Sequence, residues 1–238
     1  MANAKLIVLE GLDGAGKSTQ IELIKKYFEE HNLKYAFVHF PIYGDNEASS
    51  VIASYLRGEF GDIEKVDPVF VANMYAMDRF LYLPKLNALI QENDVVLLDR
   101  YVFSNMAFQG AKHKNALQAS ILREWIKDFE FGFLELPWPD INIFFDVPIE
   151  EIEKRLSERV GEDREYLQGK ADIHEADMEF QKRVRENYLA LKEETAFVVV
   201  KCVIDNDPVT VQLSPEQIFA NYVEYLNVVL FESKENVK

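Results

Sequence analysis

The sequence predicts a three-layer α/β fold, in which a five-stranded parallel sheet is flanked by helices on both faces. Two patterns support this prediction. Short apolar runs rich in β-branched residues recur at 5–10, 35–40, 95–100, 141–147 and 197–204, and each is typical of a buried strand. Segments with apolar residues three and four positions apart separate these runs, as in amphipathic helices. Sheets of this kind bind ligands at the carboxyl ends of their strands, so those ends are the first candidate sites.

The helical pattern covers seven segments, at 17–31, 48–57, 68–92, 115–130, 149–159, 175–194 and 215–231. No stretch rich in Gly, Ser or Pro divides the chain between them. A chain of 238 residues is long enough to bury one large core. We therefore expect a single domain over residues 1–238.

The composition limits the possible partners. A formal net charge of −15 argues against duplex nucleic acid and anionic membranes, because both are bound through an excess of Lys and Arg. No apolar run approaches the roughly 20 residues of a membrane span, and the start of the chain does not resemble a signal peptide. We expect a soluble cytoplasmic protein that binds neither nucleic acid nor membrane. The single cysteine, Cys202, lies in an apolar run and is expected to be a buried, inert thiol.

A phosphate-binding loop follows the first predicted strand. The run Gly11-Leu12-Asp13-Gly14-Ala15-Gly16-Lys17-Ser18 matches the motif G-x-x-x-x-G-K-[ST] between a strand and a helix, and Thr19 follows it. Backbone N–H groups of such loops, and the positive end of the next helix, face the phosphates of a nucleotide. We expect Lys17 to bridge the β- and γ-phosphates of ATP and Ser18 to bind Mg²⁺. The alternative is a glycine turn that only precedes a helix. The motif predicts a P-loop NTPase fold.

A charged pair closes the third predicted strand. Asp99 and Arg100 stand at its carboxyl end, beside the phosphate loop if the two strands are neighbours. The carboxylate could orient Mg²⁺ or its water ligands, and the planar guanidinium could bind a second phosphate. A second phosphate favours a phosphotransferase over a hydrolase that acts on water. The alternative is an ion pair that only caps the strand.

At this point the chain resembles thymidylate kinases over nearly its whole length. The resemblance lies in EGLDGAGKST (10–19), FPIYG (40–44), YAMDRF (75–80) and DRYVFSNMAF (99–108), followed by LPWPD (136–140) and an arginine-rich stretch from 155. It implies transfer of the γ-phosphoryl group of MgATP to dTMP, which gives dTDP and ADP in dTTP biosynthesis. It also implies an acceptor-binding region at about 40–110, a lid at about 155–175 and a homodimer.

The resemblance assigns roles to individual residues. Asp13 would accept a hydrogen bond from the sugar 3′-hydroxyl, Tyr75 would stack on thymine, and Arg79 would bind a base carbonyl near the acceptor phosphate. Tyr75 and Arg79 are four positions apart, so both can reach one ligand from the same helical face. Without the resemblance, an aromatic residue such as Tyr75 on a helix would be assigned to the core.

Four residues around the DRY segment complete the implied acceptor site. Arg100 would hold the 5′-phosphate, and Asn105 would read the Watson–Crick edge of the base. Phe108 would lie beneath the sugar and disfavour a 2′-hydroxyl. Ser104 and Phe40 belong to the same implied dTMP site. Taken alone, Phe108 would be a core residue and Asn105 an ordinary residue at a helix start.

Catalysis is implied to depend on arginines of the lid. One class of the family carries an arginine in the phosphate loop where Gly14 stands here, so the chain resembles the other class. Arg155 and Arg159 share a helical face and could reach ATP, and Arg164 is a third candidate. The alternative is a solvated helix of charge pairs four residues apart. The implied catalytic set is Lys17, Asp99, Arg100, Arg159 and Arg164, with Arg155 as an ATP-binding residue.

Two features leave alternatives open. Ile42 occupies a position where many relatives carry an arginine that contacts the acceptor phosphate, so either Arg100 and Arg79 suffice or Arg57 compensates. Asp172 begins an acidic D-x-x-E segment, and we expect it to cap the following helix rather than to bind a metal ion.

Other functions make different demands on the sequence. Deoxynucleoside kinases act on a neutral hydroxyl and commonly carry a glutamate where Asp99 stands. A GTPase would require an N-K-x-D motif, which we do not find in a suitable place. A module that only binds ATP and signals by its shape would bind ATP tightly but would not phosphorylate dTMP.

Overall fold

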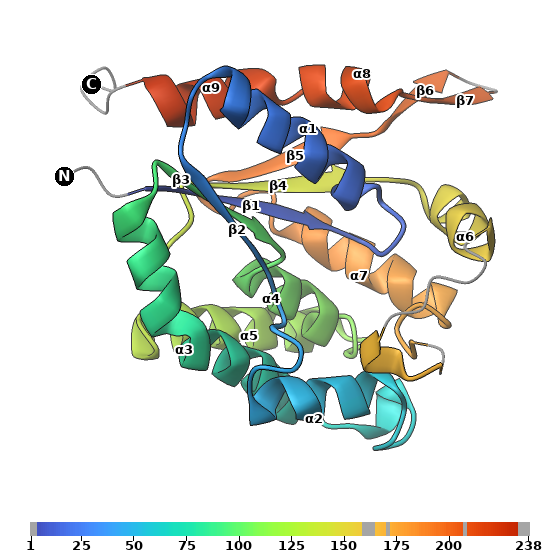
Figure 1. Cartoon of the computed structure of the whole chain (residues 1–238). Coiled ribbons are helices and arrows are strands. Elements are labelled where there is room, and N and C mark those ends of the chain that lie inside the picture. Colours follow the sequence, from blue (N-terminus) through green and yellow to red (C-terminus); the bar gives the residue numbers. More distant parts are fainter. Residues whose placement is uncertain (1–3, 159–164, 170–171, 207–208, 233–238) are drawn as a thin grey trace.

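The structure, a computed structural model, describes residues 4–158, 165–169, 172–206 and 209–232. A five-stranded parallel sheet forms its centre, in the order β2-β3-β1-β4-β5 (Figure 1). The strands are β1 (Lys5–Gly11), β2 (Tyr35–His39), β3 (Val95–Asp99), β4 (Ile141–Asp146) and β5 (Phe197–Lys201). The predicted α/β fold class and the five parallel strands are confirmed.

Helices form a layer on each face of this sheet (Figure 1). One layer contains α1 (Lys17–Glu30), α8 (Pro215–Ala220) and α9 (Val223–Phe231). The other contains α3 (Pro68–Glu92), α4 (Val102–Gly110), α5 (Ala116–Lys127) and α7 (Met178–Ala190). Two further helices, α2 (Glu47–Leu56) and α6 (Ile149–Glu158), lie at the periphery, together with the short helical turns η1 (Ile63–Lys65), η2 (Asp128–Phe133) and η3 (Glu165–Leu167). The helix α2 packs against α3.

The register of the central strands brings distant motifs together. All residues of β3 and β4 are buried, which agrees with their largely apolar sequences, VVLLD and INIFFD, in a sheet covered on both faces. Leu9 of β1 pairs with Asp99 of β3, so the end of β3 lies directly beside the chain that enters the phosphate loop. The carboxyl ends of β1, β2 and β3 therefore form one edge at which a ligand can be bound.

Several elements differ from their predicted ranges. The run 197–204 is not one strand, because β5 ends at Lys201 and β6 (Val203–Asn206) pairs antiparallel with β7 (Val209–Gln212). The predicted helix 215–231 is two helices, α8 and α9. The helix α4 was not among the predicted ranges, and all nine of its residues are buried, so it has no solvent-exposed face.

The start of α7 corrects one expectation about capping. This helix begins at Met178, and Asp177 caps it by accepting the Phe180 N–H at 2.9 Å. The expectation that Asp172 caps the helix is wrong. Its Oδ1 instead accepts the N–H of His174 at 2.8 Å, within the turn that precedes the helix. Within the described ranges, none of the helices combines the length and the apolar character that a membrane crossing requires.

Candidate active site

The phosphate loop places a buried lysine at the start of α1. Gly16 has a φ of 89°, in the left-handed region that glycine adopts without strain, and this turn leads into the helix. Lys17 is 8% exposed, and its Nζ donates to the backbone oxygens of Gly11 and Leu12 at 3.2 and 3.1 Å. Burial, followed by the charge of Arg100, lowers the pKa of this ammonium group. Ser18 and Thr19 are exposed at the same helix end, so the loop has the donors that a phosphate chain requires.

Arg100 connects the phosphate loop with the rest of the site. Its φ of 66° is rare for a residue with a side chain, and such strained residues gather at functional sites. Its Nη2 donates to Asp13 Oδ1 at 2.9 Å, and its guanidinium lies 5.0 Å from the ring centre of Phe108. Burial opposes ionisation of Asp13, but Arg100 and Lys17 outweigh it and hold the pKa of this carboxyl below its usual range.

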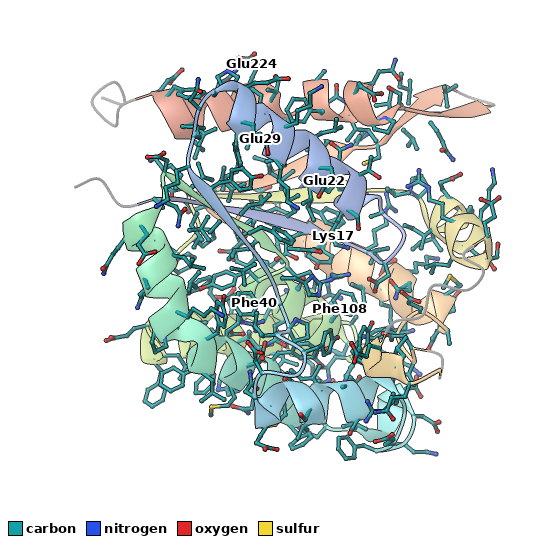
Figure 2. The ribbon with its side chains drawn as sticks, viewed as in Figure 1. Lys17, Glu22, Glu29, Phe40, Phe108 and Glu224 are labelled. Atoms are coloured by element: carbon teal, nitrogen blue, oxygen red, sulfur yellow. The ribbon has the colours of Figure 1, made fainter. Side chains whose placement is uncertain are left out.

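A pocket opens below this pair, between the sheet edge, α2, α3 and α4. The empty space inside it, counted out to the solvent at its mouth, is about 600 Å³. Figure 2 shows Phe40 and Phe108 on this side of the sheet, with Lys17 above them. All eight residues predicted for dTMP line it, namely Asp13, Phe40, Tyr75, Arg79, Arg100, Ser104, Asn105 and Phe108. The structure thus brings together residues from four separate segments of the sequence.

The inner wall of the pocket carries amide groups with free hydrogen-bonding capacity. Asn105 Nδ2 donates to Ala72 O at 3.0 Å and to Glu130 Oε1 at 2.8 Å, whereas its Oδ1 is buried without a partner among the residues that the structure describes. Gln109 lines the same pocket and is fully buried, and within the described part of the chain neither of its amide atoms has a partner. Buried amides without partners are costly, so these atoms are suited to a ligand with complementary donors and acceptors.

Arg79 lines the pocket but is held by a partner that the sequence did not indicate. Its Nε and Nη2 donate to Glu130 at 2.6 and 2.7 Å, and both side chains are almost completely buried. Glu130 lies 51 positions away in η2, where neither a motif nor the apolar spacing marks it. The third guanidinium nitrogen of Arg79, Nη1, takes no part in this pair.

Asp99 has one oxygen available at the strand end. Its Oδ2 accepts from His39 Nδ1 at 3.0 Å, while Oδ1 is buried and has no hydrogen-bond partner among the described residues. Burial raises the pKa of Asp99, but His39, Lys17 and Arg100 together hold it below its usual value. The described residues contain no cluster of three or more His, Cys, Asp or Glu side chains arranged for a metal ion. The carboxylate oxygen of Asp99, together with the phosphate loop that ends in Ser18, fits a cation that takes most of its ligands from phosphates and water.

The remaining predicted cations lie at different places. Arg155 Nη1 donates to Gly14 O of the phosphate loop at 3.1 Å, and its Nε donates to Glu151 Oε1 at 3.2 Å, a charge pair four positions apart. Arg159 and Arg164 lie outside the described residues. Arg57 pairs with Glu59 and donates to Tyr166 O, and it does not line the acceptor pocket. It therefore does not compensate for Ile42.

Several residues that the sequence analysis did not assign to the acceptor site also line the pocket. They are His39, Pro41, Tyr43, Leu56, Gln109, Tyr166, Asp172 and His174. Tyr43 and Tyr166 stack with ring centres 4.0 Å apart, and the Phe40–Pro41 peptide bond is cis. His174 is 4% exposed, and burial followed by the charge of Lys112 lowers its pKa to about 3, so its imidazole is neutral. Of these residues, Gln109 could have been identified from the sequence, because it directly follows Phe108 in the chain.

Comparison with known proteins agrees with this geometry. The family model described as thymidylate kinase matches residues 9–205. The chain belongs to the thymidylate kinase family. It is 34% identical over 218 residues to a thymidylate kinase of Mycobacterium tuberculosis, covering 90% of this chain and 99% of the relative. It is 31% identical over 216 residues to a probable thymidylate kinase of Saccharolobus solfataricus, covering 87% and 94%.

A solved structure supports the fold of this family member. The thymidylate kinase of Candida albicans superposes with a TM-score of 0.69, covering 96% of this chain and 93% of that chain at 20% identity. At this identity the likeness concerns the arrangement of sheet and helices. Family membership and the phosphate loop make the chain a kinase of nucleotide metabolism.

Proposed function

We propose that this protein transfers the γ-phosphoryl group of ATP to the 5′-phosphate of dTMP, giving dTDP and ADP. The contact between Asp13 of the phosphate loop and Arg100 of the acceptor pocket carries the proposal. The ATP site at the phosphate loop and the dTMP site in the pocket would then lie on the two sides of this ion pair. In-line transfer between two phosphates needs this adjacency.

The pocket suits a thymine nucleotide. Thymine presents alternating acceptors and a donor along its Watson–Crick edge, and the unpaired atoms of Asn105 and Gln109 can satisfy them. Tyr75 would provide a face for the base, and Phe108, whose ring centre is 5.0 Å from the Arg100 guanidinium, would lie beneath the sugar. An aromatic ring at the sugar leaves little space for a 2′-hydroxyl, so the deoxy form is favoured.

Catalysis rests on positioning and on neutralising charge. Lys17 would bind the β- and γ-phosphates, and Arg100 would hold the acceptor phosphate. The acceptor oxygen is already anionic at neutral pH, so no strong base is required. Arg155, with Arg159 and Arg164, belongs to the proposed lid at about 155–175, which would exclude water from the donor site.

Mg²⁺ is the proposed cofactor. Ser18 Oγ is exposed at the start of α1, and the unpartnered Oδ1 of Asp99 supplies a second oxygen directly or through water. Bound there with ATP, the ion would neutralise phosphate charge. The acceptor-binding region, about 40–110, then extends from the end of β2 to the end of α4.

A homodimer is proposed from the apolar surface of α3 and α5. Phe80 and Leu81 of α3 are 41% and 51% exposed, and Leu117 and Ile121 of α5 are 69% and 61% exposed. Apolar residues gathered on helices are typical of subunit contacts. Sedimentation equilibrium tests this proposal, and a single species with the mass of one chain would refute it. We also propose a cytoplasmic location, with ATP and dTMP as partners and neither nucleic acid nor membrane.

A coupled assay of ADP formation tests the function. The purified protein is given MgATP with dTMP, dUMP, dGMP, dCMP or AMP in turn. The proposal expects dTMP to give the highest kcat/KM, and it expects little ADP without an acceptor. Turnover of another monophosphate without any turnover of dTMP would refute the acceptor assignment. Tight ATP binding without any transfer would favour a binding module.

A further inference from the structure

Glu10 is a fully buried carboxyl that the proposed mechanism does not use. It lies in β1, directly before the first glycine of the phosphate loop, and its exposed fraction is 0%. Burial raises the pKa of this carboxyl, while contacts with Ser104 and Tyr188 and the charge of Arg100 oppose that rise. A buried carboxyl is costly unless its oxygens are satisfied, so its partners indicate its role.

Four donors surround Glu10, and all come from other elements. Oε1 accepts the backbone N–H groups of Tyr101 and Ser104 at 3.1 and 3.2 Å, at the start of α4. Oε2 accepts the Ser104 hydroxyl in a short hydrogen bond and the Tyr188 hydroxyl at 2.9 Å. The positive end of α4 and both hydroxyls thus favour an ionised Glu10.

The same two hydroxyls hold Arg100. Its Nη1 lies 3.3 Å from Ser104 Oγ and 3.4 Å from Tyr188 OH, and these two oxygens are 2.8 Å apart. The guanidinium can only donate, so both hydroxyls must direct oxygen lone pairs toward it. An ionised Glu10 can only accept, so it takes the hydroxyl protons on the opposite side.

Glu10 also supports the backbone of Arg100. The left-handed residue is fixed on one side by its own N–H, which donates to Leu9 O at 2.9 Å. On the other side, the N–H of Tyr101 donates to Glu10. The carboxylate therefore holds both the strained turn and the direction of the side chain that leaves it.

We propose that Glu10 is a positioning residue that orients Arg100 for the acceptor phosphate through Ser104 and Tyr188. It acts only through Arg100 and does not contact the nucleotide. The inference rests on the proposed dTMP site. It adds that the carboxylate of Glu10, which can only accept hydrogen bonds, connects the strand before the phosphate loop with the arginine proposed to bind the acceptor phosphate.

The substitution Glu10→Gln keeps the shape and reverses the hydrogen bonding. The amide oxygen would face the two backbone N–H groups, so the amide nitrogen would face the hydroxyls and donate to them. One hydroxyl can then donate its hydrogen bond to the other hydroxyl. The other hydroxyl has no acceptor among these groups, so its O–H points toward Arg100. The guanidinium is thereby displaced, which weakens its contact with a phosphate.

The test compares dTMP with thymidine, which lacks the phosphate, by calorimetric titration. In Glu10→Gln we expect dTMP affinity to fall by roughly tenfold or more, because a hydrogen bond to a charged group is lost, whereas thymidine affinity is unchanged. KM for dTMP should rise in parallel. A purely structural role would lower both affinities together, and that result would overturn the inference.

A second pair of variants covers the case in which Glu10→Gln does not fold. Tyr188→Phe removes one of the two hydroxyls and should also lower the ratio of dTMP to thymidine affinity. Tyr222→Phe is the matched control, because Tyr222 is equally buried and its hydroxyl donates to Gln20 at 2.8 Å, away from the pocket. If Tyr188→Phe leaves the ratio at the value of the control, the inference fails. If the wild-type protein does not bind dTMP, the proposed function itself fails.

Discussion

The buried pair between Arg79 and Glu130 makes a quantitative prediction about stability. Both side chains are at most 3% exposed, and Glu130 accepts two hydrogen bonds from Arg79 and one from Asn105. Glu130→Gln keeps the shape but leaves the guanidinium charge without a counterion, which typically costs about 3–5 kcal/mol. The amide oxygen still accepts one bond, so we expect roughly 3 kcal/mol. In a chain of 238 residues, this lowers Tm by roughly 6–12 °C.

Urea unfolding followed by circular dichroism measures this loss, with calorimetry for Tm. The matched control is Glu64→Gln, which breaks the exposed pair with Lys114 and should change stability little. Arg79→Met combined with Glu130→Leu should recover much of the loss, because an apolar pair removes both buried charges. A loss below about 1 kcal/mol in Glu130→Gln would refute the view that the pair neutralises a buried charge.

Three further predictions concern single side chains. Lys17→Ala should lower kcat by orders of magnitude in the coupled assay with little change in folding, and near wild-type turnover would contradict its role. His174 has a pKa of about 3 in the folded state, so the unfolded chain binds more protons from about pH 6.5 down to 3, and stability falls as pH falls. In urea titrations across this pH range, the free energy of unfolding should change by about 1.4 kcal/mol per pH unit less in His174→Gln than in the wild-type protein. The same pH dependence in both proteins would refute the buried neutral imidazole. Burial raises the pKa of Cys202 to about 12, so iodoacetamide at pH 8 should label it by mass spectrometry only after unfolding.

The fold could be predicted from the sequence where burial and periodicity agree. The strands β1, β3 and β4 are mostly apolar because both of their faces are covered, and the helix 68–92 was predicted with its observed bounds. The same rule failed where a segment is buried on all sides. The nine residues of α4 are all buried, so the helix has no solvent-exposed face, and the apolar run 197–204 does not reveal that the chain leaves the sheet at Cys202.

The site could be predicted where its residues belong to local motifs. The phosphate loop is a continuous run, and Arg100, Ser104, Asn105 and Phe108 follow one another within ten positions, so their shared pocket was expected. The partners that orient them are not local. Glu130 is 51 positions from Arg79, and Tyr188 is 88 positions from Arg100, so only the tertiary packing of η2 and α7 brings them into contact.

Among the candidate arginines, the geometry supports Arg100 as the proposed contact of the acceptor phosphate. Sequence reasoning left three candidates to offset the missing arginine at Ile42. Arg57 lies outside the pocket, and two nitrogens of Arg79 are committed to a buried carboxylate. Arg100 is also paired, but its partner Asp13 has a side chain that is 27% exposed and can exchange it for a sugar hydroxyl. The guanidinium of Arg100 is held in place by hydroxyl oxygens, and a ligand can replace its partner Asp13. It can therefore bind a phosphate without a further rearrangement of the chain.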